Sequence, residues 1–155
     1  MEILTSIAEN VAGEFIALLL GAIITGVFVY LRNKGLLNIG KGRLTSSPDH
    51  TKVASESGGE IYVMDRDGAR NVTKHPALDK VAIWSPDSTK IAFMSERDGT
   101  WQAWVVKDTG GRAAKLTSGF GESRPIRWDE DGNLIVRLGG SFLTVYAYEI
   151  EKRLA

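Results

Sequence analysis

A stretch of about ten residues that recurs along the chain constrains its fold more than any other feature. SSPDHTKVAS (46–55) aligns with WSPDSTKIAF (84–93), and WDEDGNLIV (128–136) is a third, shortened copy. A period of about 40 residues, with about four short strands in each period, is typical of the blades of a β-propeller. We therefore predict an all-β fold in which about three antiparallel four-stranded blades, a partial propeller, occupy residues 44–155.

The residues within each copy explain why it would form a strand, a turn and a second strand. Pro86 sets φ at about −65° and cannot extend the preceding strand, and Asp87 can hydrogen-bond to the turn backbone. Trp84 and Trp128 recur in register, 44 residues apart, which indicates that both pack in the core of their blades. The residues to which we assign a structural role share these repeat positions: Pro48, Asp49, Trp84, Pro86, Asp87, Trp128 and Asp131.

The middle copy resembles the WD-like repeat of the TolB-type β-propellers. The resemblance rests on WSPD (84–87), KIAF (90–93) and RDG (97–99), and IYVMDRDGARNVT (61–73) is similar to the strand and closing turn of the same repeat. It covers residues 44–154 in three copies, of which the first lacks the Trp and the third has Asp-Glu in place of Ser-Pro. Because this fold hosts many unrelated functions, the resemblance predicts architecture rather than activity.

Three blades are fewer than a closed ring requires. Propellers typically have four to eight blades, and the TolB resemblance implies six. An open arc leaves unpaired faces and edges, and homo-oligomers most often adopt closed twofold symmetry. We therefore expect two chains to form a six-bladed ring. A partner chain, a higher oligomer, an open arc and a natural truncation of a longer propeller remain alternatives.

The N-terminal segment predicts a membrane anchor. VAGEFIALLLGAIITGVFVYL (11–31) carries a single charge, and a helix of this length spans the hydrocarbon core of roughly 30 Å. We assign residues 1–31 to a tail and one transmembrane helix, and residues 32–43 to a basic flexible linker. Small residues recur every four positions in the span, which favours close helix packing in lipid. They are Gly13, Ala17, Gly21 and Thr25.

The charges on either side of this span predict its orientation. Residues 1–31 contain no Lys or Arg, whereas Arg32, Lys34, Lys41 and Arg43 follow the span. The positive-inside rule then predicts a single-pass protein of the bacterial inner membrane with its C-terminal domain in the cytoplasm. The TolB resemblance implies the periplasm instead, which remains the alternative.

No pattern in the sequence predicts catalysis, a metal or a cofactor. GGSFL (139–143) lacks the second Gly of G-x-S-x-G. The chain has no Cys and only two His residues, which lie in different repeats, so the ligands of a zinc site are not supplied. The net charge is zero and no basic stripe is present, which argues against nucleic acid as a partner. We expect a non-enzyme with no cofactor.

The most economical interpretation is a membrane-anchored binding module that acts as a protein-interaction scaffold. We predict that the loops at 75–80 and 118–124 contact a partner, with His75, Trp101 and Arg124 as candidate residues. Trp101 does not recur in the repeat and is expected to be exposed. Arg124 is expected just before the inner strand of the third blade, pointing to the axis. Two alternatives are a membrane sensor or effector, whose propeller binds a ligand and controls association of the transmembrane helices, and an accessory subunit of a larger membrane complex.

Overall fold

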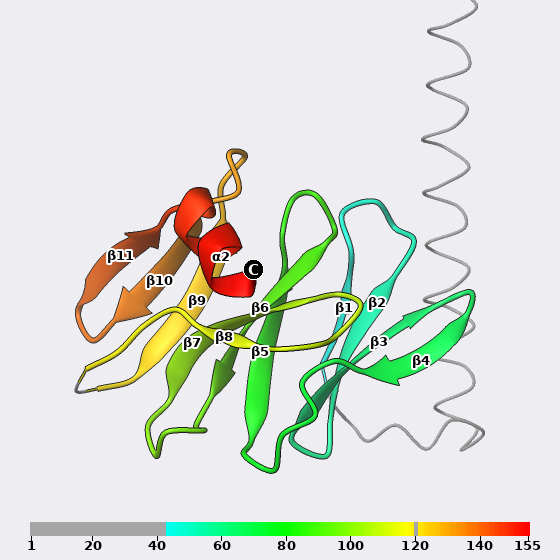
Figure 1. The fold of residues 1–155 in the computed structure, drawn as a ribbon, viewed down its shortest axis with the longest axis horizontal. Helices are drawn as coiled ribbons and strands as arrows, with labels where there is room; N and C mark the ends of the chain where they lie inside the picture. The colour runs from blue at the N-terminus through cyan, green and yellow to red at the C-terminus, as the bar shows by residue number, and fades with distance from the viewer. Residues whose placement is uncertain (1–42, 120) are drawn as a thin grey trace, which may run out of the picture.

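The computed structural model describes residues 43–119 and 121–155, which form three antiparallel sheets lying side by side in a fan (Figure 1). We call these sheets blades 1, 2 and 3. Blade 1 consists of β1 (Leu44–Ser46), β2 (Val53–Ser57), β3 (Glu60–Asp65) and β4 (Gly68–Asn71). Blade 2 consists of β5 (Asp79–Trp84), β6 (Lys90–Ser95), β7 (Gln102–Lys107) and β8 (Ala114–Lys115). Blade 3 consists of β9 (Ser123–Trp128), β10 (Leu134–Leu138) and β11 (Ser141–Val145), and α2 (Ala147–Leu154) follows it.

Blades 1 and 2 have the predicted architecture. Their strands follow one another in the orders β1-β2-β3-β4 and β5-β6-β7-β8, and every neighbouring pair is antiparallel. The prediction of antiparallel four-stranded sheets is therefore confirmed for these two blades. In blade 3 it is wrong, because that sheet has the order β11-β10-β9 and the following residues form a helix instead of a fourth strand.

Local interactions explain why residues 147–154 are helical. The side-chain oxygen of Asn133 accepts a hydrogen bond from the backbone N–H of Ala147, at the start of the helix. Glu149 lies in the first turn, and Lys152 and Arg153 lie in the last, which suits the helix dipole. One face of the helix is anchored because the side chain of Ile150 is buried.

The recurring turns share one hydrogen-bond pattern in blades 1 and 2. In blade 2, the Ser85 hydroxyl donates to the Asp87 carboxylate and accepts from the Lys90 N–H at 2.9 Å. In blade 1, Ser47, Asp49 and Lys52 make the equivalent bonds. These side chains close the loop between two strands, which fixes where each blade turns.

Blade 3 closes the same turn with a different residue. The Asp129 carboxylate accepts from the backbone N–H of Asn133 at 2.8 Å and also accepts from the Asn133 side chain. The sequence comparison assigned this role to Asp131, which corresponds to Asp87 but has an exposed side chain. Because blade 3 has a carboxylate where the other blades have a serine hydroxyl, the accepting group lies two residues earlier.

Two apolar clusters hold the blades together, one at each joint between blades. The first cluster joins blades 1 and 2, with Ala54, Ile61 and Val63 on one side and Trp84, Ile91 and Phe93 on the other. The second joins blades 2 and 3 and α2, through Ala92, Ala103, Val105, Leu116, Leu134, Val136, Val145 and Ile150. Blade 2 therefore buries both of its faces, and the core of the described region lies between the sheets.

The structure leaves the predicted anchor untested. The span at 11–31, its small residues Gly13, Ala17, Gly21 and Thr25, and the linker up to residue 42 lie outside the described residues. Within residues 43–119 and 121–155, the structure contains no helix with the length and apolar character needed to cross a membrane.

Candidate functional site

The two joints between blades use the same indole hydrogen bond. The Trp84 indole N–H donates to the Thr45 carbonyl of β1 at 2.9 Å, and the Trp128 indole N–H donates to the Ile83 carbonyl of β5 at 3.3 Å. Thr45 and Ile83 occupy the same position in successive copies of the repeat. Each tryptophan thus joins the inner strand of its own blade to the inner strand of the preceding blade.

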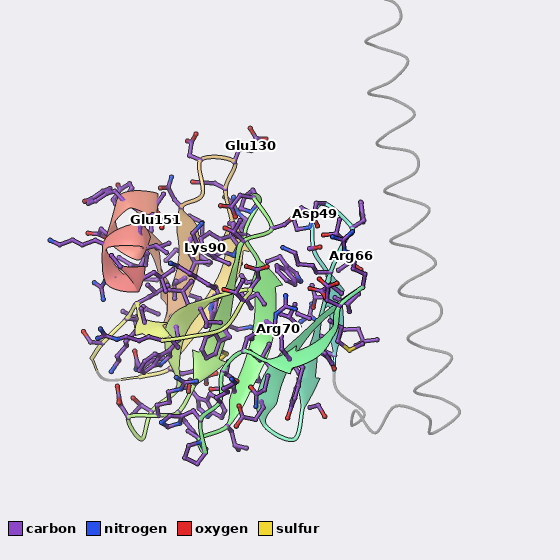
Figure 2. All side chains as sticks on the ribbon, turned by 45° about the vertical axis from the view of Figure 1, so that its right-hand side comes forward. Asp49, Arg66, Arg70, Lys90, Glu130 and Glu151 are labelled. Carbon is purple, nitrogen blue, oxygen red and sulfur yellow. The ribbon has the colours of Figure 1, made fainter. Side chains whose placement is uncertain are left out.

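A lysine crosses each joint at an equivalent position. Lys52 of blade 1 forms an ion pair with Asp108 of blade 2 at 2.7 Å, and Lys90 of blade 2 forms one with Glu151 of α2 at 3.0 Å. Figure 2 shows the labelled Lys90 and Glu151 close to each other. In the joint between blades 2 and 3, α2 therefore supplies the carboxylate that the β7–β8 connection supplies in the first joint.

The turn carboxylates are held in their ionised form. Partial burial by itself raises the pKa of Asp87, but hydrogen bonds from Lys90, Ser85 and Thr89 outweigh this effect and hold that pKa well below its usual range. In blade 1, burial of Asp49 is likewise outweighed by hydrogen bonds from Ser47 and Thr51, so its pKa is lowered. These carboxylates stabilise the turns, because they accept hydrogen bonds from neighbouring residues of the same turn.

The outer face of blade 3 is exposed and basic. The strand register places Arg124 opposite Arg137, and Arg137 opposite Phe142. It also places Ile135 between Arg127 and Thr144. Residues opposite each other on neighbouring strands share a sheet face. We call this set the blade 3 face: Arg124, Arg127, Ile135, Arg137, Phe142 and Thr144.

The corresponding positions of blades 1 and 2 are apolar and buried. Ile135, Phe142 and Thr144 align with Ala92, Ala103 and Val105 of blade 2, which pack against blade 3. On blade 3, by contrast, the Phe142 side chain is 69% exposed. The sheet face that is buried against the next blade in blades 1 and 2 is therefore exposed to solvent in blade 3.

Charge distinguishes the blade 3 face from the buried joints. Arg124, Arg127 and Arg137 are exposed, and within the described part of the chain no ion pair involves them. Like charges directly opposite each other on neighbouring strands are destabilising, and Arg124 faces Arg137 in this way. The face is therefore suited to a partner that offers both carboxylates and apolar side chains.

An open groove runs between the turns at the ends of the inner strands. It has a volume of about 460 Å³, and its lining includes Pro48, Pro86, Ile126 and Trp128. A smaller pocket of about 270 Å³ lies between the blade 2 turn and α2, next to Ile150. Among the described residues, no group of three or more His, Asp or Glu side chains is arranged to hold a metal ion.

The three predicted partner-binding residues lie in different surroundings. The His75 side chain accepts a hydrogen bond from the Ala77 N–H through Nδ1, and the backbone N–H of His75 donates to the Glu60 carboxylate. The Trp101 ring is covered by the Lys80 ammonium, which lies 3.7 Å from its centroid. Trp101 is therefore half-buried and not freely exposed as expected.

Arg124 lies in a strand and not in the loop that the sequence suggested. It is the second residue of β9, and it follows Ser123, whose N–H donates to the Trp101 carbonyl at 2.7 Å. The structure thus brings Arg124 close to the Trp101 backbone. It also brings Arg124 beside Arg137, which lies in turn beside Phe142, and the sequence analysis selected neither Arg137 nor Phe142. An alignment of the third copy with the second could have drawn attention to Arg137, because this charged residue aligns with the buried Met94 of blade 2.

Comparison with known proteins adds sequence relatives over part of the chain. No family model matches. The chain is 42% identical over 55 residues to the uncharacterized peptidase YuxL of Bacillus subtilis (strain 168), covering 34% of this chain and 8% of that protein. It is 40% identical over 48 residues to the TolB homolog of Protochlamydia amoebophila (strain UWE25), covering 31% of this chain and 10% of that protein. The chain thus spans about a tenth of the length of these curated relatives.

Solved structures establish the fold. TolB from Acinetobacter baumannii superimposes with a TM-score of 0.53 and 24% identity, over 67% of this chain and 29% of that one. A putative TolB from Agrobacterium tumefaciens has a TM-score of 0.50 and 18% identity, over 66% and 44%. A puromycin-hydrolyzing peptidase from Mycobacterium tuberculosis has a TM-score of 0.51 and 18% identity, over 65% and 19%. The described region has a TolB-type β-propeller fold, as predicted.

Proposed function

We propose that this chain is a non-enzymatic, membrane-anchored β-propeller module that binds proteins and acts as a scaffold. The observation that carries the proposal is the blade 3 face, which repeats the positions of a buried joint but is exposed. An apolar patch rimmed by polar groups is typical of a protein-binding surface, and on this face the exposed Phe142 and the half-buried Ile135 lie among three arginines. The turn carboxylates of Asp49 and Asp87 accept hydrogen bonds from residues of their own turns, which gives them a structural role.

A second copy of the chain is the partner that we propose for this face. Two arcs of three blades would complete a six-bladed ring, with blade 3 of each copy packed against blade 1 of the other. In such a ring both chains enter from the same side, which suits two parallel anchors in one membrane.

The joint between copies would differ from the two joints within the chain. Blade 1 has Ser46 at the position of Trp84, so it cannot donate the indole hydrogen bond that joins blades elsewhere. The blade 3 face also carries three arginines where the buried joints are largely apolar. We therefore expect a weaker joint than those inside the chain, and a dimer that dissociates on dilution.

Light scattering of the full-length protein in detergent tests the dimer. The protein mass, after subtraction of detergent, should be twice the 16.9 kDa of the chain. Ile135→Glu should give a monomer, because it places a carboxylate in the centre of the proposed joint. Ile135→Val is the matched control, since it keeps an apolar, branched side chain at this position and should leave the dimer intact. A monodisperse wild-type monomer would contradict the dimer.

The orientation in the membrane has a separate test. We propose that the blades lie in the cytoplasm, on the basis of the basic residues after the predicted span. Protease added outside intact cells should then leave residues 44–155 uncut. Cleavage there would place the blades on the periplasmic side.

Two of the similar proteins carry the word peptidase in their names, so the absence of catalysis also needs a test. The purified chain should leave puromycin unchanged during a prolonged incubation. Turnover that scales with protein concentration and survives repurification would overturn the non-enzymatic proposal.

A further inference from the structure

Among the described residues, the outermost strand of blade 3 has an unpaired edge. Within residues 43–119 and 121–155, β11 pairs with β10 and with no other strand, whereas blades 1 and 2 each have a fourth strand beyond the third. After β11 the chain turns into α2, which contacts β7 and β8 of blade 2. The Arg153 side chain donates to the Lys115 carbonyl of β8 at 2.6 Å. The helix is thus held against the neighbouring blade, and no described residue occupies the position of a fourth strand in blade 3.

The ladder geometry identifies the backbone groups at this edge. The N–H of Gly139 donates to the Glu122 carbonyl on the β9 side of β10. In an antiparallel sheet, the N–H and C=O groups of one residue point to the same side, and successive residues alternate. The backbone N–H and C=O groups of Leu138, Val136 and Leu134 therefore point toward β11. Their partners in β11 are Ser141, Leu143 and Val145, whose backbone groups point toward β10. The N–H and C=O groups of Phe142 and Thr144 therefore point outward.

The side chains of β11 do not protect this edge. Edge strands are usually blocked by a charge, a proline, a bulge or short length. β4 carries Arg70, and β8 has only two residues, one of which is Lys115. The sequence of β11 is SFLTV, which carries no charge and in which Phe, Thr and Val favour strands. Phe142 is 69% exposed and Leu143 is 42% exposed, so both faces of the edge offer apolar surface.

We propose that β11 binds an extended segment of a partner protein, which adds to the sheet as the fourth strand of blade 3. The outward groups of Phe142 and Thr144 would supply main-chain hydrogen bonds, and pairing of this kind requires an extended segment. Contact with Phe142 on one face and Leu143 on the other selects a segment with apolar, strand-favouring residues at alternate positions.

A single added strand fits this blade better than a second copy. It gives four strands, as in blades 1 and 2, whereas pairing of β11 with β11 of another copy would create a continuous six-stranded sheet. The edge shares Phe142 and Thr144 with the blade 3 face, but its outward N–H and C=O groups point along the plane of the sheet and not toward the neighbouring blade of the proposed ring. The main-chain pairing proposed here therefore does not depend on the dimer.

A phage-displayed library of random twelve-residue peptides, panned against full-length protein in detergent, tests the proposal. Thr144→Pro is the blocking variant, because proline removes an outward N–H without removing a bond to β10. Thr144→Val is the matched control, since it keeps that N–H and the shape of the side chain. Selected peptides should bind the wild type and Thr144→Val equally and bind Thr144→Pro at least tenfold more weakly. If Thr144→Pro does not fold, Leu143→Lys replaces it as the blocking variant, with the same expected loss.

Hydrogen exchange locates the bound peptide. The amides of Phe142 and Thr144 should exchange at least tenfold more slowly when the selected peptide is present, while the Leu143 amide, already bonded to β10, should change little. Failure to select any peptide that distinguishes Thr144→Pro from Thr144→Val would overturn the proposal. Slow exchange of Phe142 and Thr144 in the free protein, together with a lower mass for Thr144→Pro, would overturn it in favour of self-pairing. Ile135→Glu should not affect peptide binding, which separates this result from the outcome for the ring.

Discussion

Blades 2 and 3 contain the same repeat, yet their surroundings differ on one side. Blade 2 contributes to both apolar clusters, with Ile91 and Phe93 on one face and Ala92 and Ala103 on the other. Blade 3 contributes to one cluster and presents arginines and Phe142 on its other face. The comparison shows that the repeat specifies how a blade is built, while the residues on its outward face decide whether another blade can follow.

The largest difference should appear when the two joint tryptophans are removed. Trp84 is 7% exposed and lies in the first cluster, whereas Trp128 is half-buried beside the second. Trp84→Ala should lower the free energy of unfolding by about 3–5 kcal/mol, the usual cost of truncating a buried aromatic residue. Trp128→Ala should cost about half as much, because less of its surface is buried. Urea unfolding followed by circular dichroism measures both, and equal costs would mean that the two joints are equally packed.

A second comparison concerns the left-handed residue of each turn. His50 has φ +59° and Gly132 has φ +78° at the same position of the repeat. His50→Gly should raise the free energy of unfolding by about 0.5–1 kcal/mol, because a residue with a Cβ is strained in this conformation. Gly132→Ala should lower it by about 1 kcal/mol for the same reason. Opposite shifts of the thermal midpoint would support this account, and shifts of the same sign would exclude it.

Acid should weaken the turns in a defined pH range. Because the folded-state pKa of Asp87 is depressed, its contribution is complete above the unfolded pKa of about 4 and is lost as the pH falls below that value. Asp87→Asn should cost about 1 kcal/mol at neutral pH, a modest value because the carboxylate is half exposed to solvent. The difference from wild type should shrink between pH 5 and pH 2. A difference that is constant over this range would show that the charge contributes nothing.

The smallest effects should come from the lysines that cross the joints. The Lys52–Asp108 pair is mostly buried, whereas Glu151 in the Lys90–Glu151 pair is 58% exposed. Lys52→Ala should therefore lower stability by about 1 kcal/mol and Glu151→Ala by less than about 0.5 kcal/mol. Repeating both measurements at high salt checks the assignment, since the exposed pair should lose its contribution first.

The sequence was a good guide to the strands and a poor guide to their outer faces. Arg124 was expected just before the inner strand of blade 3, and it is instead the second residue of β9. Pro125 follows it within the strand, which is tolerated because β9 is the innermost strand of its sheet and one side of its backbone needs no partner. Trp101 was expected to be exposed because it does not recur. It is half-buried because Lys80, on a strand distant in sequence, covers its ring.

By itself the sequence determined the period of the repeat, the turns and the strands of blades 1 and 2. These features depend on local residue chemistry: Pro and Asp form turns, and alternating apolar residues form strands. Only the tertiary structure decided that α2 replaces the fourth strand of blade 3 and that Arg137 and Phe142 share a face with Arg124. Both depend on which residues pair across strands and on where Ile150 can be buried, and such contacts between distant segments leave little trace in any short stretch of sequence.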